Sequence, residues 1–102
     1  MSREEDPRVL FGLHLKALRQ RRGWSQEDLS LESKLARSYV GEVERGHRNI
    51  ALVNICILAA TFGVPPSEML NFDAELSAIT AAVKAKRGGT GKSVSRRQPG
   101  KG

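Results

Sequence analysis

Several kinds of residue are scarce in this chain of 102 residues, and each scarcity excludes a class of protein. The single cysteine, Cys56, excludes an internal disulfide framework, and with only His14 and His47 a Cys/His zinc cage is excluded as well. No apolar run approaches the roughly 18–20 residues of a membrane span, and the N-terminal region lacks the apolar core of a secretory signal. We therefore expect a small cytoplasmic protein with no metal and no cofactor.

Positive charge is in excess, but most of the excess lies at the C-terminal end. The chain has 17 Lys and Arg against 11 Asp and Glu, and residues 88–102 contain four basic residues and no acidic one. Because this Gly- and Ser-rich tail has almost no apolar side chain, we predict that it is disordered. It would be a solubilising tail, a remnant of cloning or a weak polyanion-binding arm.

Residues 7–72 have the pattern of one all-α domain with no strand signal. The first helix starts at Asp6-Pro7, an N-cap followed by proline at the first helical position, and it stops before Gly23. Ser25 is the predicted cap of the second helix, and Asp73 that of a last helix in a separate segment, 73–87. The helices are expected at residues 7–22, 26–32, 37–45, 52–62 and about 66–70, with the last at about 74–86.

The helix predicted at 52–62 is unusually apolar, so we expect it to be a core element. Its expected core residues include Leu52 and Cys56. In the short helix that follows, Met69 and Leu70 are expected to pack.

Helices 26–32 and 37–45, joined by a short connection, form the pattern of a helix-turn-helix. On the second of them, Ala36, Val40 and Val43 are expected to face inward. Gly41 inside this helix costs about 1 kcal/mol of helix stability relative to alanine. Two alternative reasons can explain a glycine there: close approach of the helix to DNA, or neutral drift on a solvated face. The outward face is small or polar, as contact with base edges requires, and comprises Ser38, Gly41, Glu42 and Arg45, with Arg37 on its flank.

Three segments, in this order and spacing, resemble the Cro/CI-type helix-turn-helix family, also called XRE. They read LKALRQRRGWSQEDLS, LARSYVGEVERGHRNI and LAATFGVPPSEML, between Phe11 and Leu70. The stretch RSYVGEVERGHRN is especially similar to the small controller proteins of restriction–modification operons. The resemblance implies a five-helix, lambda-repressor-like domain, extended here by a C-terminal helix and a basic tail, in a DNA-binding transcriptional regulator or repressor.

The resemblance also implies roles for individual residues. Gln26 would hold a DNA phosphate and brace the recognition helix, and Arg37 and Ser38 would read bases in the major groove. An arginine at that helix start can pair with guanine O6 and N7. Arg19 and Glu44 match a structural pair that ties the first helix to the third.

The remaining implied contacts leave alternatives open. Tyr39 would contact the DNA backbone or pack half-buried, and Glu42 would either accept from a cytosine N4 or face solvent. Arg48 and Asn49 match groove-edge and phosphate contacts. The full set of predicted DNA-binding residues is Ser25, Gln26, Arg37, Ser38, Tyr39, Glu42, Arg48 and Asn49.

The sequence departs from the family at three places. Ala36 stands where a capping side chain is usual, so the start of the third helix is poorly satisfied. Ile50 and Ala51 replace a common Pro-Ser, which leaves Asn49 as the expected cap of the fourth helix. Lys34 replaces a small residue at the turn between the second and third helices.

We expect a homodimer on double-stranded DNA, because one recognition helix contacts few base pairs and two half-sites lie about one turn (roughly 34 Å) apart. The alternative is an antitoxin or bridging module that uses this fold for a protein partner. We do not expect an enzyme, because no nucleophile motif or phosphate loop is present. The predicted dimer residues, which could instead pack on their own domain, are Leu70, Phe72, Leu76, Ile79 and Val83.

Overall fold

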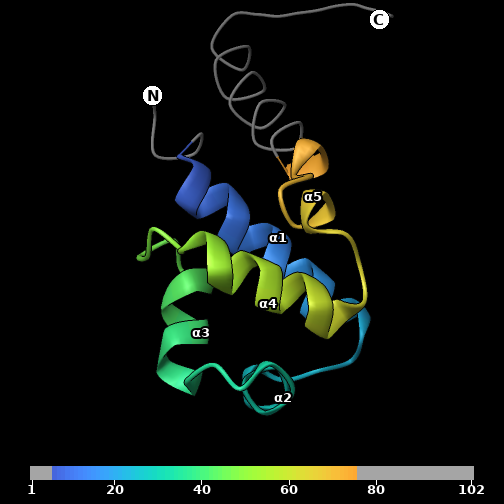
Figure 1. The fold of residues 1–102 in the computed structure, drawn as a ribbon. Helices are drawn as coiled ribbons and strands as arrows, with labels where there is room; N and C mark the ends of the chain where they lie inside the picture. Colours follow the sequence, from blue (N-terminus) through green and yellow to red (C-terminus); the bar gives the residue numbers. More distant parts are fainter. Residues whose placement is uncertain (1–5, 76–102) are drawn as a thin grey trace, which may run out of the picture.

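The structure, a computed structural model, describes residues 6–75, and within them it contains five helices and no strand. The predicted bounds differ from the observed ones by no more than one residue at either end, which confirms the all-α, five-helix prediction. The helices are α1 (Pro7–Arg21), α2 (Gln26–Ser33), α3 (Arg37–Glu44), α4 (Leu52–Phe62) and α5 (Pro66–Met69) (Figure 1).

The chain becomes helical again at residues 73–75, so Asp73 already belongs to this turn and is not the cap that the sequence predicted. The rest of the predicted last helix and the basic tail lie outside the described residues. So do three of the predicted dimer residues, Leu76, Ile79 and Val83.

Local capping explains where the first two helices start. The Asp6 carboxylate accepts a hydrogen bond from the backbone N–H of Arg8. Ser25 and Asp28 form a capping box, in which each side chain accepts from the other's backbone N–H. The start of α3 lacks a side-chain cap, as predicted from Ala36.

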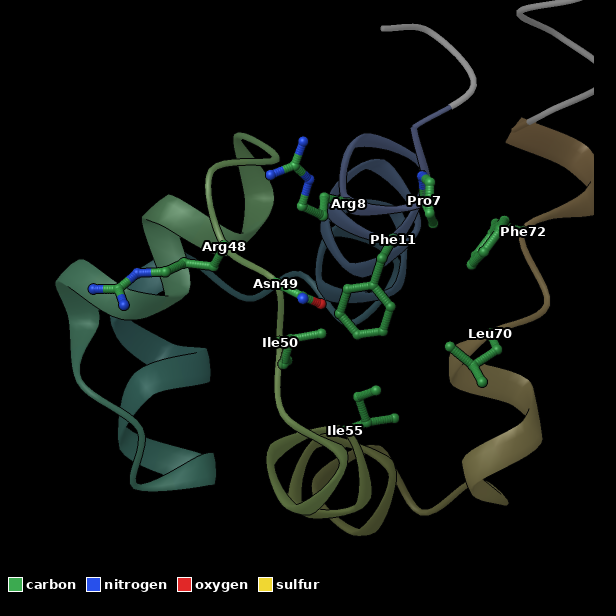
Figure 2. A pocket seen from close by; sticks show the side chains of 9 residues that line it. All are labelled: Pro7, Arg8, Phe11, Arg48, Asn49, Ile50, Ile55, Leu70 and Phe72. Atoms are coloured by element: carbon green, nitrogen blue, oxygen red, sulfur yellow. The ribbon is translucent and has the colours of Figure 1, made fainter. Parts of the chain in front are cut away.

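The predicted cap of α4 is wrong. The N-cap residue of α4 is Ala51, and no side chain caps it. Asn49 lies two residues too early in the chain to occupy the capping position, and its amide points toward Phe11 (Figure 2).

The core lies between α1 and the four helices that follow it (Figure 1). Leu15, Leu29 and Met69 are fully buried. Where α1 ends, the rings of Trp24 and Phe62 stack with centroids 5.5 Å apart, and the Arg22 guanidinium lies over both rings. The buried apolar cluster comprises Phe11, Leu15, Leu29, Val40, Val43, Leu58, Ala59, Phe62 and Met69.

Several expected core residues are exposed instead. Leu52 is 72% exposed, Leu70 is 51% exposed and Cys56 is also on the surface. The reasons differ, because Cys56 lies off the buried stripe of α4, which contains Leu58, Ala59 and Phe62, whereas Leu52 is the first residue of α4 and Leu70 follows the end of α5. Ala36 is exposed because it precedes α3 in an extended conformation and so does not share the inward face of that helix.

The backbones of α1 and α3 approach each other closely at Gly12. A Cβ atom at this position would lie 2.5 Å from the carbonyl oxygen of Val43 and 2.6 Å from that of Glu44. No larger side chain fits without separating the two helices. Gly12 therefore fixes the contact that orients α3.

The turn between α2 and α3 contains the one non-glycine residue with positive φ among residues 6–75, Lys34 (φ 66°). Its left-handed conformation ends α2, and the Ser30 hydroxyl donates to the Leu35 carbonyl across the turn at 2.6 Å. Leu35 packs against the core from this turn. The turn thus keeps the helix-turn-helix geometry in spite of the lysine.

No single helix within residues 6–75 has the length and apolar character to cross a membrane. Helix α4 and the segment Pro66–Glu75 reach the length and apolar composition of a membrane span only when they are counted together. The two are bent by 104° at the break between them.

Candidate nucleic-acid interface

Two long-range contacts hold α3 in place, and both end on Glu44. Nε of Arg19 donates to Oε2 of Glu44 at 2.6 Å and Nη2 donates to Oε1 at 2.9 Å, so the predicted structural pair is present as a bidentate contact. Nε2 of Gln26 also donates to Oε1 of Glu44, at 2.9 Å. The bond to Glu44 raises the pKa of Arg19, while its burial acts in the opposite direction. Glu44 therefore ties α3 to both α1 and α2.

The opposite side of α3 faces outward and is mostly polar. Arg37, Ser38 and Arg45 are exposed and Glu42 is half-buried. We call these four residues the recognition face. Val40 and Val43, on the inward side, are 1% and 2% exposed.

Gly41 is buried, which corrects the expectation that it lies open on the outward side. A Cβ atom there would lie 3.3 Å from Nη1 of both Arg37 and Arg45, and 3.5 Å from Oε1 of Gln26. The ends of these three side chains thus cover the glycine. The absence of a side chain at position 41 gives them the room to converge on the middle of the helix.

A second cluster joins the recognition face to the loop that follows α3. Nε of Arg48 donates to Oε1 of Glu42 at 2.7 Å, and the Arg48 guanidinium carbon lies 5.4 Å from the centroid of the Tyr39 ring. Nδ2 of Asn54, on α4, donates to the Tyr39 hydroxyl at 3.0 Å. The hydrogen bond from Arg48 is the main cause that lowers the pKa of Glu42. In the unbound protein, then, Glu42 pairs with an arginine.

Neighbouring loop residues point in opposite directions. Figure 2 shows the guanidinium of Arg48 turned away from a pocket of about 160 Å³, while the amide of Asn49 points toward Phe11 in the pocket. Apolar side chains, among them Ile55 and Phe72, form most of the wall. Asn49 therefore does not share the side of the loop on which Arg48 lies.

The structure brings most of the predicted contact residues together in two groups. Gln26, Arg37 and Arg45 meet over Gly41, and Tyr39, Glu42 and Arg48 form the second cluster. Ser38 is exposed on the same face, whereas the Ser25 hydroxyl is engaged in capping α2. Among the described residues, no group of three His, Cys, Asp or Glu side chains is arranged to hold a metal ion.

The comparison with protein families agrees with this arrangement. A family model described as "Helix-turn-helix" matches residues 15–69, which include α2, the turn at Lys34 and α3. The chain belongs to this helix-turn-helix family. The Cro/CI-type (XRE) assignment made from the sequence, a family of DNA-binding transcription regulators, is confirmed.

Three relatives of this helix-turn-helix protein refine the assignment. It is 42% identical over 67 residues to a hypothetical transcription factor of Neisseria meningitidis, a match that covers 66% of this chain and 63%, less than two thirds, of that relative. It is 39% identical over 66 residues to the control protein C.BamHI of Bacillus amyloliquefaciens, covering 64% of this chain and 82% of that protein. The crystal structure of the restriction-modification controller protein C.AhdI from Aeromonas hydrophila has a TM-score of 0.59 and 52% identity, covering 61% of this chain and 94% of that one. The predicted similarity to controller proteins is confirmed.

Sequence reasoning missed two residues of the helix-turn-helix site. Asn54 had a signal, because it is the one amide side chain in α4, whose other residues are apolar except for Thr61. Gly12 had a weaker one, a glycine in the middle of a helix with no cap or turn to explain it. Their partners, Tyr39 and the backbone of α3, are distant in sequence.

Proposed function

We propose that the chain is a sequence-specific transcriptional regulator that places α3 in the DNA major groove and binds two half-sites as a homodimer. The observation that carries this proposal is the division of α3 into two sides. One side is buried through Val40, Val43 and Glu44, and the other presents the recognition face to solvent. A helix held this firmly, with an outward face of polar side chains, suits the width of the major groove.

Within this proposal, Arg37 reads a base and Gln26 contacts a phosphate. Arg37 is the first residue of α3, and in helix-turn-helix proteins the first residues of the recognition helix reach the base edges. Gln26 starts α2 and already bonds to Glu44 through its nitrogen, so its amide is oriented. Its oxygen lies beside Arg37 and Arg45 over Gly41.

The homodimer is supported by an exposed apolar surface that we call the α4 face: Leu52, Val53, Cys56 and Leu70. Leu52, Val53 and Leu70 are 72%, 69% and 51% exposed. Leu52, Val53 and Cys56 are neighbours on α4 by helical spacing, and exposed apolar residues grouped in this way on a small domain mark an interaction site. The predicted dimer residue Leu70 belongs to the α4 face and Phe72 is half-buried near it, so the proposed interface extends onto α4.

Selection of bound duplexes from a random library tests the base-reading role of α3. Wild-type protein should select a two-half-site sequence, and Arg37→Ala should lose preference at one base position of each half-site while its helicity stays unchanged. Lys16→Ala, which removes an exposed charge from α1, is the control and should preserve the ranking. Unchanged ranking in Arg37→Ala would contradict the role given to Arg37.

Sedimentation analysis tests the dimer. Leu52→Asp should shift the protein to monomer, because it buries a charge in the proposed interface. Leu31→Asp is the matched control, since Leu31 is 67% exposed but lies on α2. A monomeric wild-type protein would contradict the homodimer and favour the alternative function as a protein-interaction module.

A further inference from the structure

A carboxylate on the recognition face is unexpected, because DNA phosphates repel it. Glu42 is nevertheless placed there, and its side chain is 38% exposed. It accepts a hydrogen bond at 2.7 Å from Nε of Arg48, which lies six residues later, in the loop after α3. The carboxylate thus has a partner that also belongs to the predicted DNA contacts.

Two groups contact and restrain the Arg48 side chain. Glu42 binds its Nε atom, and the Tyr39 ring lies under its guanidinium with 5.4 Å between the guanidinium carbon and the ring centroid. The ring itself is restrained, because Asn54 donates to its hydroxyl at 3.0 Å. Arg48 remains 52% exposed, so its outer part is accessible.

We propose that Glu42 is a positioning residue for Arg48, and that it orients the guanidinium to read a guanine in the operator. This inference rests on the proposed function, since it assigns a role within the same DNA-binding surface. Nε is occupied by Glu42, and within residues 6–75 the two terminal nitrogens of Arg48 make no hydrogen bond. Figure 2 shows these nitrogens at the outer end of a side chain that points away from the pocket.

The paired carboxylate favours a base over a phosphate as the target of Arg48. Two terminal nitrogens match the two acceptors, O6 and N7, on the major-groove edge of guanine. A phosphate bound to the same guanidinium would bring its negative charge close to the carboxylate of Glu42, whereas the guanine edge is uncharged. Glu42 therefore follows neither of the two alternatives left open by the sequence, contact with a cytosine or exposure to solvent alone. It acts through Arg48.

The first test examines the pair in the free protein. In a spectrum of the arginine Nε–H groups, the Arg48 signal should exchange slowly with solvent in the wild type. The signal should lose this protection in Glu42→Gln and keep it in Glu32→Gln, which removes an exposed carboxylate from α2. Equal exchange in all three proteins would overturn the proposal without any bearing on DNA binding.

The second test measures base preference by selection from a random duplex library and by titration of single-base operator variants. Arg48→Ala should lose a guanine preference at one position of each half-site. Glu42→Gln should reduce the preference at that same position by about tenfold, and Glu32→Gln should leave it unchanged. The double variant should equal Arg48→Ala, because Glu42 has no effect once its arginine is absent.

The outcomes are distinct. If Glu42→Gln changes preference at another base pair, or lowers it further in the Arg48→Ala background, Glu42 contacts DNA independently and the proposal is overturned. It is also overturned if Glu42→Gln binds every duplex more tightly with an unchanged ranking. A wild-type protein with no sequence preference overturns the proposed function and, with it, this inference.

Discussion

Two arginine–glutamate pairs end on α3, one on each side of the helix, and they differ both in their surroundings and in the number of hydrogen bonds, since Arg19 binds Glu44 through two nitrogens and Arg48 binds Glu42 through one. The Nε to carboxylate distance is 2.6 Å for Arg19–Glu44 and 2.7 Å for Arg48–Glu42. The side chains of the first pair are 10% and 3% exposed, and those of the second are 52% and 38% exposed. An arginine–glutamate pair therefore occurs once inside the domain, as a bidentate contact, and once at its surface, as a single hydrogen bond.

The difference assigns different tasks to the two glutamates. Two residues apart on a helix is a rotation of roughly 200°, so Glu42 and Glu44 point to opposite sides. A buried charge that loses its partner is left uncompensated in a poorly solvated site, so Glu44 holds the fold. An exposed pair is solvated and screened, so Glu42 contributes little to stability and can serve the DNA-binding surface.

The largest expected effect comes from removing the buried carboxylate. Glu44→Gln should lower the free energy of unfolding by about 3 kcal/mol, because Arg19 then stays buried without its counter-charge. Glu42→Gln should leave the urea unfolding midpoint unchanged. Equal losses of stability in the two variants would contradict the division between a structural side and a functional side of α3.

Two glycine substitutions give a second contrast between the same two sides. Gly12→Ala should lower the free energy of unfolding by about 1–3 kcal/mol, because its Cβ would collide with the backbone of α3. Gly41→Ala should instead raise it by up to about 1 kcal/mol, since the new methyl group meets only flexible side-chain ends and alanine favours the helix. Gly41→Ala should also weaken operator binding. Urea unfolding and a DNA titration of both variants measure these effects, and a stability loss in Gly41→Ala would contradict the explanation.

The helices were predictable because their boundaries have local signals. Asp6-Pro7 and Ser25 mark helix starts, and the glycines that follow α1, α3 and α4 (Gly23, Gly46 and Gly63) all have positive φ. These signals depend on a few consecutive residues, so no knowledge of the packing is needed. The pair of Arg19 and Glu44 was also anticipated, although from the resemblance to the family and not from the residues themselves.

What was missed depends on contacts between distant segments. Leu52 looks like a core residue in an apolar helix, and only the packing of α4 shows that the start of the helix is uncovered at this residue. The cover over Gly41 requires side chains from two helices, and the environment of Glu42 requires the loop to bring Arg48 back to α3. The periodicity of apolar residues cannot predict such contacts, because it shows which side of one helix a residue lies on and not how that helix is placed against the others.

A smaller effect is expected at the turn between α2 and α3. Lys34→Gly should raise the free energy of unfolding by about 1 kcal/mol, because glycine adopts the left-handed conformation found there without the steric cost that lysine bears. The variant touches neither glutamate, so the base preference of the protein should not change. Thermal unfolding and library selection check the two parts, and a changed base ranking would show that stability and specificity are coupled through this turn.

The smallest expected effect is the titration of the surface pair itself. Because Arg48 lowers the pKa of Glu42, the pair stabilises the fold above the ordinary pKa of glutamate, and this contribution is lost as the pH falls through the lowered value. The carboxyl carbon signal of Glu42 should therefore titrate at a lower pH in the wild type than in Arg48→Ala. Asp28 is the internal control, since its pKa is lowered mainly by the backbone N–H of Ser25 and should not respond to Arg48→Ala. If the titration of Glu42 were the same in both proteins, Arg48 would not hold that carboxylate in solution, and the surface pair would lose the role that distinguishes it from the buried one.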